Sequence, residues 1–183
     1  MKKLLIKVCG LKDATNISAL SGLEIDLFGF IFYPPSPRHV EENTTALDLL
    51  SSTVKQKKTG VFVNETAEKI RSKANTYNLD CLQLHGQESP EFCHSFRPGF
   101  KVLKAFPIAE ASDFEACNNY EGACDYFLFD TKGPKHGGNG ISFNWGILDH
   151  YSGETPFFLS GGISAGDAAK IKSVNHEKLA GLD

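Results

Sequence analysis

The chain has 183 residues, of which 41% are hydrophobic and 22% are charged, and it carries a formal net charge of −3 at pH 7. These values are typical of a folded globular protein of one domain, so they argue against extensive disorder. The small negative charge also argues against a surface built to bind nucleic acid or an anionic membrane.

We expect neither a membrane span nor a secretory leader in this chain. No apolar run reaches the roughly 18 residues that a spanning helix needs. Residues 1–6 are basic and then apolar, but Lys7 interrupts the apolar run and no small-residue cleavage site follows. The five cysteines are odd in number and lack CxxC spacing, which fits neither a disulfide framework nor a zinc site. We therefore expect a cytoplasmic protein with reduced cysteines.

Short apolar runs alternate with helix-like segments along the chain. Apolar runs bounded by turn residues predict buried strands at residues 4–8, 27–32, 60–63, 81–84, 101–106, 126–131, 156–159 and 178–182. The segments between them predict helices at residues 13–20, 40–50, 66–77, 90–95, 111–118, 145–150 and 165–171. Asp13 is the expected N-cap of the first helix, and Gly22 follows its end.

This alternation predicts right-handed βαβ units and a parallel sheet, the α/β class. Eight such units predict a closed (β/α)₈ TIM barrel. An open doubly wound sheet is the alternative, but no GxGxxG motif follows the first strand, which argues against its dinucleotide-binding form. We expect residues 1–183 to form a single barrel domain that ends after strand eight, without a last helix.

Two reactive residues stand where predicted strands end, at the barrel edge that usually carries chemistry. Side chains alternate between the two faces of a strand, so Lys7 and Cys9 share one face of the first strand. Asp130 shares a face with Leu128 near the end of the sixth strand. If both faces point inward, a thiol and a carboxyl group meet across a small pocket as base and acid. The alternatives are a packed strand residue for Cys9 and a turn or cap residue for Asp130.

Other candidates follow the strands at the same edge. Arg38 comes after a proline-rich loop and can grip a carboxylate bidentately, or it is a surface arginine. His85 follows the fourth strand, where the alternative is a structural histidine. Glycine clusters after strands six and seven can bring backbone N–H groups close to a phosphate, although turns also need glycine. The six histidines are scattered, so we predict no metal site.

Short motifs occur at residues 7–10, 29–38, 60–64, 82–86, 129–140, 143–145 and 159–162. Each is weak alone, but together they cover nearly the whole chain, and they resemble the motifs of the N-(5′-phosphoribosyl)anthranilate isomerase family in the same order. The resemblance implies an isomerase of tryptophan biosynthesis that needs no cofactor. It also implies a small phosphoribosyl substrate, no nucleic-acid or membrane partner, and a monomer or homodimer.

The resemblance also implies site residues. Cys9 matches the general base of the family and Asp130 its general acid. Arg38 matches the residue that holds the anthranilate carboxylate, and the glycines after strand seven match the loop at the phosphate. Asp183 matches the aspartate that precedes a further glycine-containing loop and a last helix. The expected substrate-binding set is Arg38, His85, Gly137, Gly138, Gly140, Gly161, Gly162 and Asp183.

The implied reaction is an Amadori rearrangement, which opens an aminoaldose and converts it into an aminoketose. An acid must protonate the ribose ring oxygen, and a base must then remove the proton from C2′. A carboxylic acid at a dry rim stays partly protonated near neutral pH. The pKa of a free thiol, roughly 8.5, must fall for Cys9 to act as a base at neutral pH. We expect Lys7, on the same strand face, to lower it.

Two other functions stay open from the residues alone. One is another phosphate-binding barrel enzyme, such as a histidine-pathway aminoaldose isomerase or indoleglycerol-phosphate synthase. The first would be expected to use two aspartates, and the second needs catalytic lysines, so the pairing of Cys9 with Asp130 argues against both. The other is a barrel that binds a phosphosugar or a partner without turnover.

Overall fold

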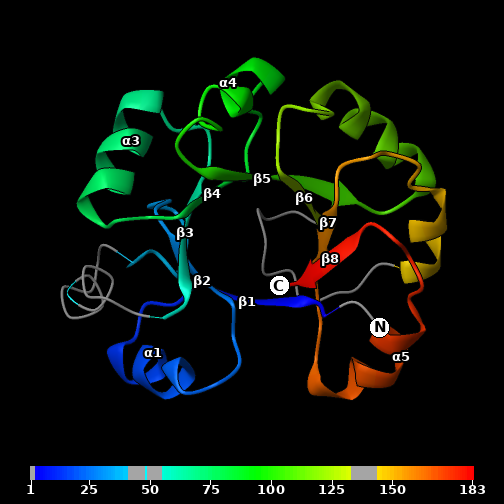
Figure 1. Ribbon diagram of the computed structural model, residues 1–183, viewed down its shortest axis with the longest axis horizontal. Helices are drawn as coiled ribbons and strands as arrows, with labels where there is room; N and C mark the ends of the chain where they lie inside the picture. The colour runs from blue at the N-terminus through cyan, green and yellow to red at the C-terminus, as the bar shows by residue number, and fades with distance from the viewer. Residues whose placement is uncertain (1–2, 41–47, 49–54, 133–143) are drawn as a thin grey trace.

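A computed structural model describes residues 3–40, 48, 55–132 and 144–183 of the chain. Within these residues, eight parallel strands close into a barrel in chain order, and helices surround it (Figure 1). The strands are β1 Leu5–Cys9, β2 Leu27–Ile31, β3 Lys57–Phe62, β4 Cys81–Leu84, β5 Lys101–Ile108, β6 Tyr126–Thr131, β7 Phe157–Leu159 and β8 Leu179–Leu182. The predicted (β/α)₈ barrel is confirmed, and the open sheet is excluded because β1 pairs with both β2 and β8.

The helices between the strands are short. They are α1 Ala14–Ser21, α3 Ala67–Thr76, α4 Pro90–His94, η2 Ala111–Tyr120, η3 Trp145–His150, η4 Ala165–Asp167 and α5 Ala168–Ser173, where η marks a 3-10 helix. The helix predicted at residues 40–50 falls mostly outside the described residues. Within the described part of the chain, no helix combines the length and the apolar character that a membrane crossing requires.

Side-chain caps define where several helices begin. Asp13 accepts a hydrogen bond from the Asn16 N–H at 2.9 Å, which confirms the predicted N-cap of α1. Thr66 and Ser89 cap α3 and α4 in the same way. Each of these oxygens satisfies an N–H group that has no partner inside the helix. The cap therefore defines the residue at which the helix begins. β3 begins earlier than the apolar run predicts, at Lys57, because its polar first residues already pair with β2.

Alternation along the strands separates two hydrophobic layers. Side chains on one face pack inside the barrel; they are Leu27, Cys81, Leu103, Ala105, Leu128, Phe158 and Ala180. Side chains on the other face pack against the helices, and fully buried phenylalanines are prominent among them; examples are Phe28, Phe62, Phe127, Phe129 and Phe157. Burying each such ring contributes about 1.5–3 kcal/mol, so this outer layer holds the helices onto the barrel.

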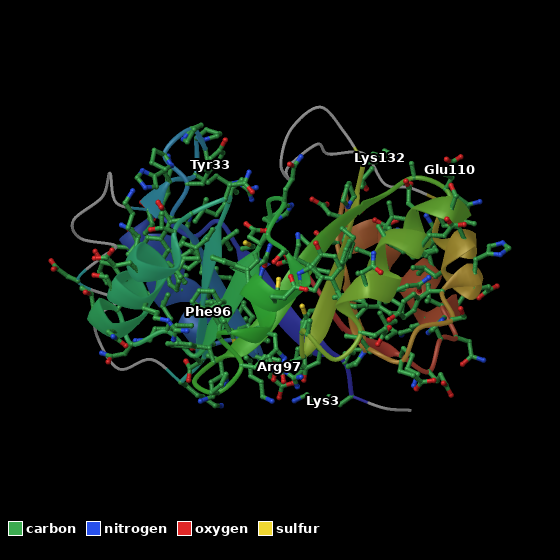
Figure 2. The ribbon with its side chains drawn as sticks, turned by 90° about the horizontal axis from the view of Figure 1, so that it is seen from above. Lys3, Tyr33, Phe96, Arg97, Glu110 and Lys132 are labelled. Carbon is green, nitrogen blue, oxygen red and sulfur yellow. The ribbon has the colours of Figure 1, made fainter. Side chains whose placement is uncertain are left out.

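The two ends of the barrel carry different loops. Figure 2 shows Tyr33, Glu110 and Lys132 at one end of the molecule and Lys3 and Arg97 at the other. The first three follow strands β2, β5 and β6, whereas Lys3 and Arg97 precede β1 and β5. Residues that follow strands therefore gather at a single edge, as a parallel barrel requires.

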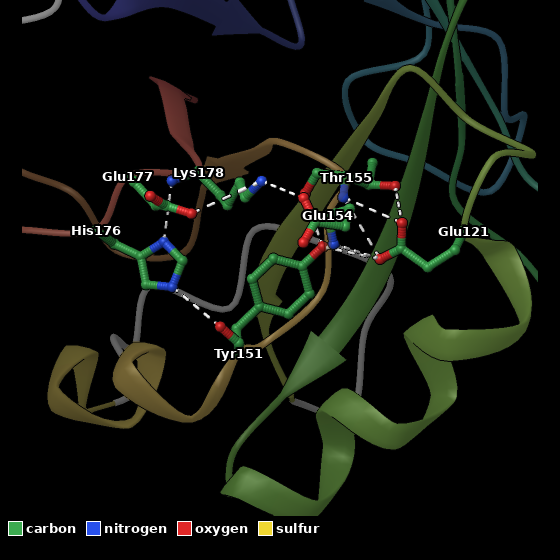
Figure 3. A network of polar contacts seen from close by, with 7 residues as sticks. All are labelled: Glu121, Tyr151, Glu154, Thr155, His176, Glu177 and Lys178. Carbon is green, nitrogen blue, oxygen red and sulfur yellow. Dashed lines mark hydrogen bonds and ion pairs between the residues drawn. The ribbon is translucent and has the colours of Figure 1, made fainter.

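A polar network stabilises the opposite, amino-terminal end of the barrel (Figure 3). Glu121, after η2, accepts hydrogen bonds from Thr155 Oγ1 at 2.6 Å and from the Thr155 N–H at 3.1 Å. The Tyr151 hydroxyl donates to Thr155 O at 2.6 Å, and burial raises the pKa of Tyr151. His176 contacts Tyr151 O and accepts from the Lys178 N–H. The network ties η2, η3 and the start of β8 together.

Replacing Thr155 with valine tests this network. Thr155→Val keeps the shape of the side chain but removes the donor to Glu121, so the free energy of unfolding should fall by about 1–3 kcal/mol. Urea denaturation measures the change. Glu154→Gln is the control, because Glu154 is exposed and its loss should change stability much less. Equal stability of Thr155→Val and the unaltered chain would contradict the role of the network.

Candidate active site

β1 delivers Cys9 to the edge of the barrel. Cys9 is the last residue of β1 and lies beside Gly29 of β2 in the sheet register. A Cβ on Gly29 would stand only 2.7 Å from Cys9 Sγ, so glycine leaves the space that the thiol occupies. Lys7, two residues earlier on the same face, is buried inside the barrel. The predicted inward orientation of Lys7 and Cys9 is therefore confirmed.

Lys7 forms a buried ion pair with Asp183, the residue after β8. Lys7 Nζ lies 2.8 Å from Asp183 Oδ2, and the two side chains are 0% and 6% exposed. The Asp183 N–H donates to Leu159 O of β7 at 2.9 Å, which holds the aspartate at the edge of the barrel. Its second oxygen, Oδ1, is buried and has no hydrogen-bond partner among the described residues. This oxygen can accept a hydrogen bond from a bound hydroxyl.

The thiol is harder to ionise than the sequence predicts. Burial raises the pKa of Cys9, the ammonium of Lys7 lowers it, and the carboxylate of Asp183 raises it again. The net direction is upward, so the predicted fall toward neutrality is wrong for the protein without substrate. Lys7 itself acts in the predicted direction. Burial lowers the pKa of Lys7, but Asp183 and Cys9 outweigh burial and raise it, so Lys7 stays charged.

Asp130 lies near the end of β6 and is only 6% exposed. Its Oδ1 accepts from the Thr131 N–H at 2.9 Å and from Ser160 Oγ at 3.4 Å. Its Oδ2 lies 3.6 Å from His85 Nε2. Three strand ends, those of β4, β6 and β7, therefore meet at this carboxyl group. The alternative of a turn or cap residue does not fit, because Asp130 lies within β6.

His85 is oriented by a neighbour in β4, the strand that it follows. Gln83 Nε2 lies 3.1 Å from His85 Nδ1, and Gln83 is buried. If the amide N–H donates to Nδ1, the proton of a neutral imidazole stands on Nε2, which faces Asp130. Gln83 was not among the residues predicted for the site. Strand parity was the available signal, because Gln83 and His85 stand two residues apart.

Arg38 lies against the end of β1. Its Nη1 is 3.4 Å from Cys9 O, and the side chain is half-buried. Gly10 has φ of +83°, and a Cβ there would stand 2.7 Å from Arg38 Cδ. Glycine is therefore required both for the left-handed backbone and for the path of the arginine. The predicted surface alternative for Arg38 does not describe this half-buried position against the backbone carbonyl of Cys9.

The glycines after β7 adopt left-handed backbone conformations. Gly161 and Gly162 have φ of +89° and +68°. A Cβ on Gly161 would stand 2.2 Å from Thr131 Oγ1, so the loop after β7 packs directly on the end of β6. The predicted glycines Gly137, Gly138 and Gly140 lie outside the described residues.

Comparisons with known proteins show the family of the chain. A family model described as N-(5′phosphoribosyl)anthranilate (PRA) isomerase matches residues 6–183. An N-(5′-phosphoribosyl)anthranilate isomerase from Parabacteroides distasonis is 50% identical over 182 residues, which cover 98% of this chain and 82% of the relative. The chain belongs to this isomerase family. It is therefore an isomerase of tryptophan biosynthesis, as the resemblance implied.

Solved members of the family have the same fold. A phosphoribosyl anthranilate isomerase in complex with reduced 1-(o-carboxyphenylamino)-1-deoxyribulose 5-phosphate has a TM-score of 0.79 and 28% identity, over 99% of this chain and 86% of that one. Monomers generated from the dimeric isomerase of Thermotoga maritima match with a TM-score of 0.78 and 28% identity, with the same coverage of 99% and 86%.

The influence of Lys7 on the thiol can be measured directly. Lys7→Met removes the ammonium that lowers the pKa of Cys9 and leaves the Asp183 carboxylate that raises it, so the thiol should titrate at higher pH. The pH dependence of iodoacetamide alkylation reports the midpoint, and Cys9→Ala identifies the signal of this thiol. Lys57→Met, at the amino-terminal end of β3, is the matched control and should leave the midpoint unchanged. An unchanged midpoint in Lys7→Met would contradict the electrostatic coupling.

Proposed function

We propose that the chain converts N-(5′-phosphoribosyl)anthranilate into 1-(2-carboxyphenylamino)-1-deoxyribulose 5-phosphate, with Asp130 as general acid and Cys9 as general base. The observation that carries the proposal is that the family match spans β1 to β8 while both groups stand at one edge of the barrel. The related isomerase holds a reduced form of this product, which supports the substrate class.

Asp130 begins the reaction by protonating the ribose ring oxygen. As the ring C–O bond breaks, the anthranilate nitrogen donates its electron pair to C1′ and an iminium ion forms. A buried carboxyl group surrounded by hydrogen-bond partners keeps its position during this step. His85, 3.6 Å from the carboxylate, is placed to stabilise the charge that remains on Asp130 after the proton leaves.

Cys9 completes the reaction by removing the C2′ proton of the iminium ion. The C–H electron pair forms the C1′–C2′ double bond, the iminium nitrogen is neutralised, and the enolamine then tautomerises to the ketone. Because the pKa of Cys9 is raised, a smaller fraction of the thiol is ionised. The thiolate that does form is a stronger base. Once the ring has opened, the positive charge of the iminium ion favours ionisation of the thiol.

The surrounding residues would hold the substrate. Arg38, beside Cys9, is placed to bind the anthranilate carboxylate in a bidentate manner. The free oxygen of Asp183 is suited to accept a ribose hydroxyl. The backbone N–H groups of Gly161 and Gly162 are assigned to the phosphate. Gly137, Gly138 and Gly140 lie outside the described residues and remain predicted substrate-binding residues.

Substitution of the two proton-transfer groups tests the function. Cys9→Ala and Asp130→Asn should each reduce kcat by about 10²–10⁴-fold, because each removes one general catalyst. The decrease in anthranilate-type fluorescence measures turnover. Binding of the reduced product and circular dichroism control for the substrate site and the fold. A folded native chain that binds the reduced product but does not turn over substrate would show a binding protein instead.

Arg38→Lys tests how the carboxylate is recognised. Lysine keeps the charge but loses the two parallel N–H donors, so kcat/KM should fall by about 10–100-fold, as expected for hydrogen bonds to a charged group. The control is a substrate analogue that lacks the carboxylate. Arg38→Lys and the unaltered enzyme should process this analogue with similar kcat/KM. An equal loss with both substrates would show that Arg38 does not bind the carboxylate.

A further inference from the structure

A buried ion pair on the outer side of the barrel plays no part in the chemistry described above. Lys104 shares the outer face of β5 with Val102 and Phe106, and Glu88 lies in the loop between β4 and α4. Lys104 Nζ is 3.4 Å from Glu88 Oε2, and each side chain is 3% exposed. Removing two charges from water is costly, so the pair must be offset by further contacts.

Lys104 donates hydrogen bonds to backbone carbonyls, two of which flank His85. Its Nζ donates to Gly86 O at 2.8 Å and to Leu84 O at 3.4 Å. These two carbonyls belong to the residues directly before and after His85. A third bond, to Ala105 O at 3.0 Å, anchors the ammonium to its own strand. The lysine therefore holds the Leu84–His85 peptide before the histidine and the Gly86–Gln87 peptide one residue beyond it.

Glu88 holds the same loop through N–H groups. Its carboxylate accepts from the Gly86 N–H, at 2.9 Å to Oε2 and 3.1 Å to Oε1, and from the Asn64 N–H at 2.9 Å. Asn64 has φ of +51° and accepts from the Gln87 N–H at 2.6 Å. A Cβ on Gly86 would stand 2.3 Å from Asn64 Oδ1. The loops after β3 and β4 are thus locked together around the ion pair.

The loop after β4 carries His85, whose imidazole faces Asp130. The His85 N–H donates to Phe62 O at 2.9 Å, and its ring reaches to 3.6 Å from Asp130 Oδ2. We propose that Lys104 and Glu88 are positioning residues of the isomerase reaction, because they fix the backbone on both sides of His85 and so hold its ring against Asp130. This inference rests on the proposed function of Asp130.

The first experiment removes both charges together, since a single substitution leaves the other charge buried and unpaired. The double variant Lys104→Met, Glu88→Gln keeps the volume and one amide oxygen for the Asn64 N–H. Because misplacement of a group by about 1 Å can cost on the order of 10²-fold, kcat should fall about 10–100-fold while KM changes less than about threefold. Unchanged kcat in a folded double variant would overturn the proposal.

A second comparison separates positioning of His85 from general support of the fold. In a His85→Ala background, the double variant should lower kcat by less than about twofold, because the residue through which it acts is absent. The same loss with and without His85 would show that the pair acts elsewhere. Lys101→Met removes a lysine from the opposite end of the same strand and should leave kcat unchanged in both backgrounds.

A measurement without turnover distinguishes failure of this inference from failure of the proposed function. Long-range ¹H–¹⁵N NMR spectra of the His85 ring should show one fixed tautomer in the native chain and in Lys101→Met, and a broadened or mixed signal in the double variant. An unchanged ring signal in the double variant would overturn the positioning role, whether or not the chain is active. Absence of turnover by the native chain would instead overturn the proposed function.

A milder substitution keeps the test decisive if the double variant does not fold. Asn64→Gly suits the left-handed backbone and removes the oxygen that accepts from the Gln87 N–H. It loosens the same loop without burying a charge. We expect kcat to fall at least about threefold, since the loop position is only partly released. Wild-type kcat together with an unchanged His85 signal would overturn the proposal.

Discussion

The structure depends on the seam where β1 pairs with β8 and closes the barrel. Leu5 lies beside Gly181 in this pairing, and a Cβ on Gly181 would stand 2.6 Å from Leu5 O, so the strands approach closely only because glycine is there. The buried pair of Lys7 with Asp183 crosses the same seam at 2.8 Å. An ion pair in this position is costly unless both partners are held, and the two strands hold them.

Closure of the seam decides the electrostatics of the thiol. Burial disfavours the thiolate of Cys9, and the ammonium of Lys7 favours it. Asp183 keeps Lys7 charged but opposes its effect on the thiol, because the carboxylate raises the pKa of Cys9 while the ammonium lowers it. In the proposed reaction, the positive charge of the cationic intermediate would therefore add to that of Lys7 in favouring the thiolate.

The part of the barrel edge that carries Asp130 and His85 is held by residues on the outer face of the barrel. Asp130 is surrounded by groups from β4 and β7, and His85 reaches it from a loop that Lys104 and Glu88 hold by its peptide groups. The inner face of the strands thus carries Cys9 and Asp130, while the outer face carries Lys104, which bonds the loop after β4. Both roles follow from the alternation of side chains along a strand.

Much of this arrangement was readable from the sequence, because the signals are local. Apolar runs and turn residues placed all eight strands, and the two-residue period placed Lys7, Cys9 and Asp130 on inward faces. The bonds from Lys104 to the peptides around His85 were not readable. Neither was the upward shift in the pKa of Cys9. Both depend on burial and on distances between segments far apart in the chain, such as Lys7 and Asp183, and these distances exist only once the barrel has closed.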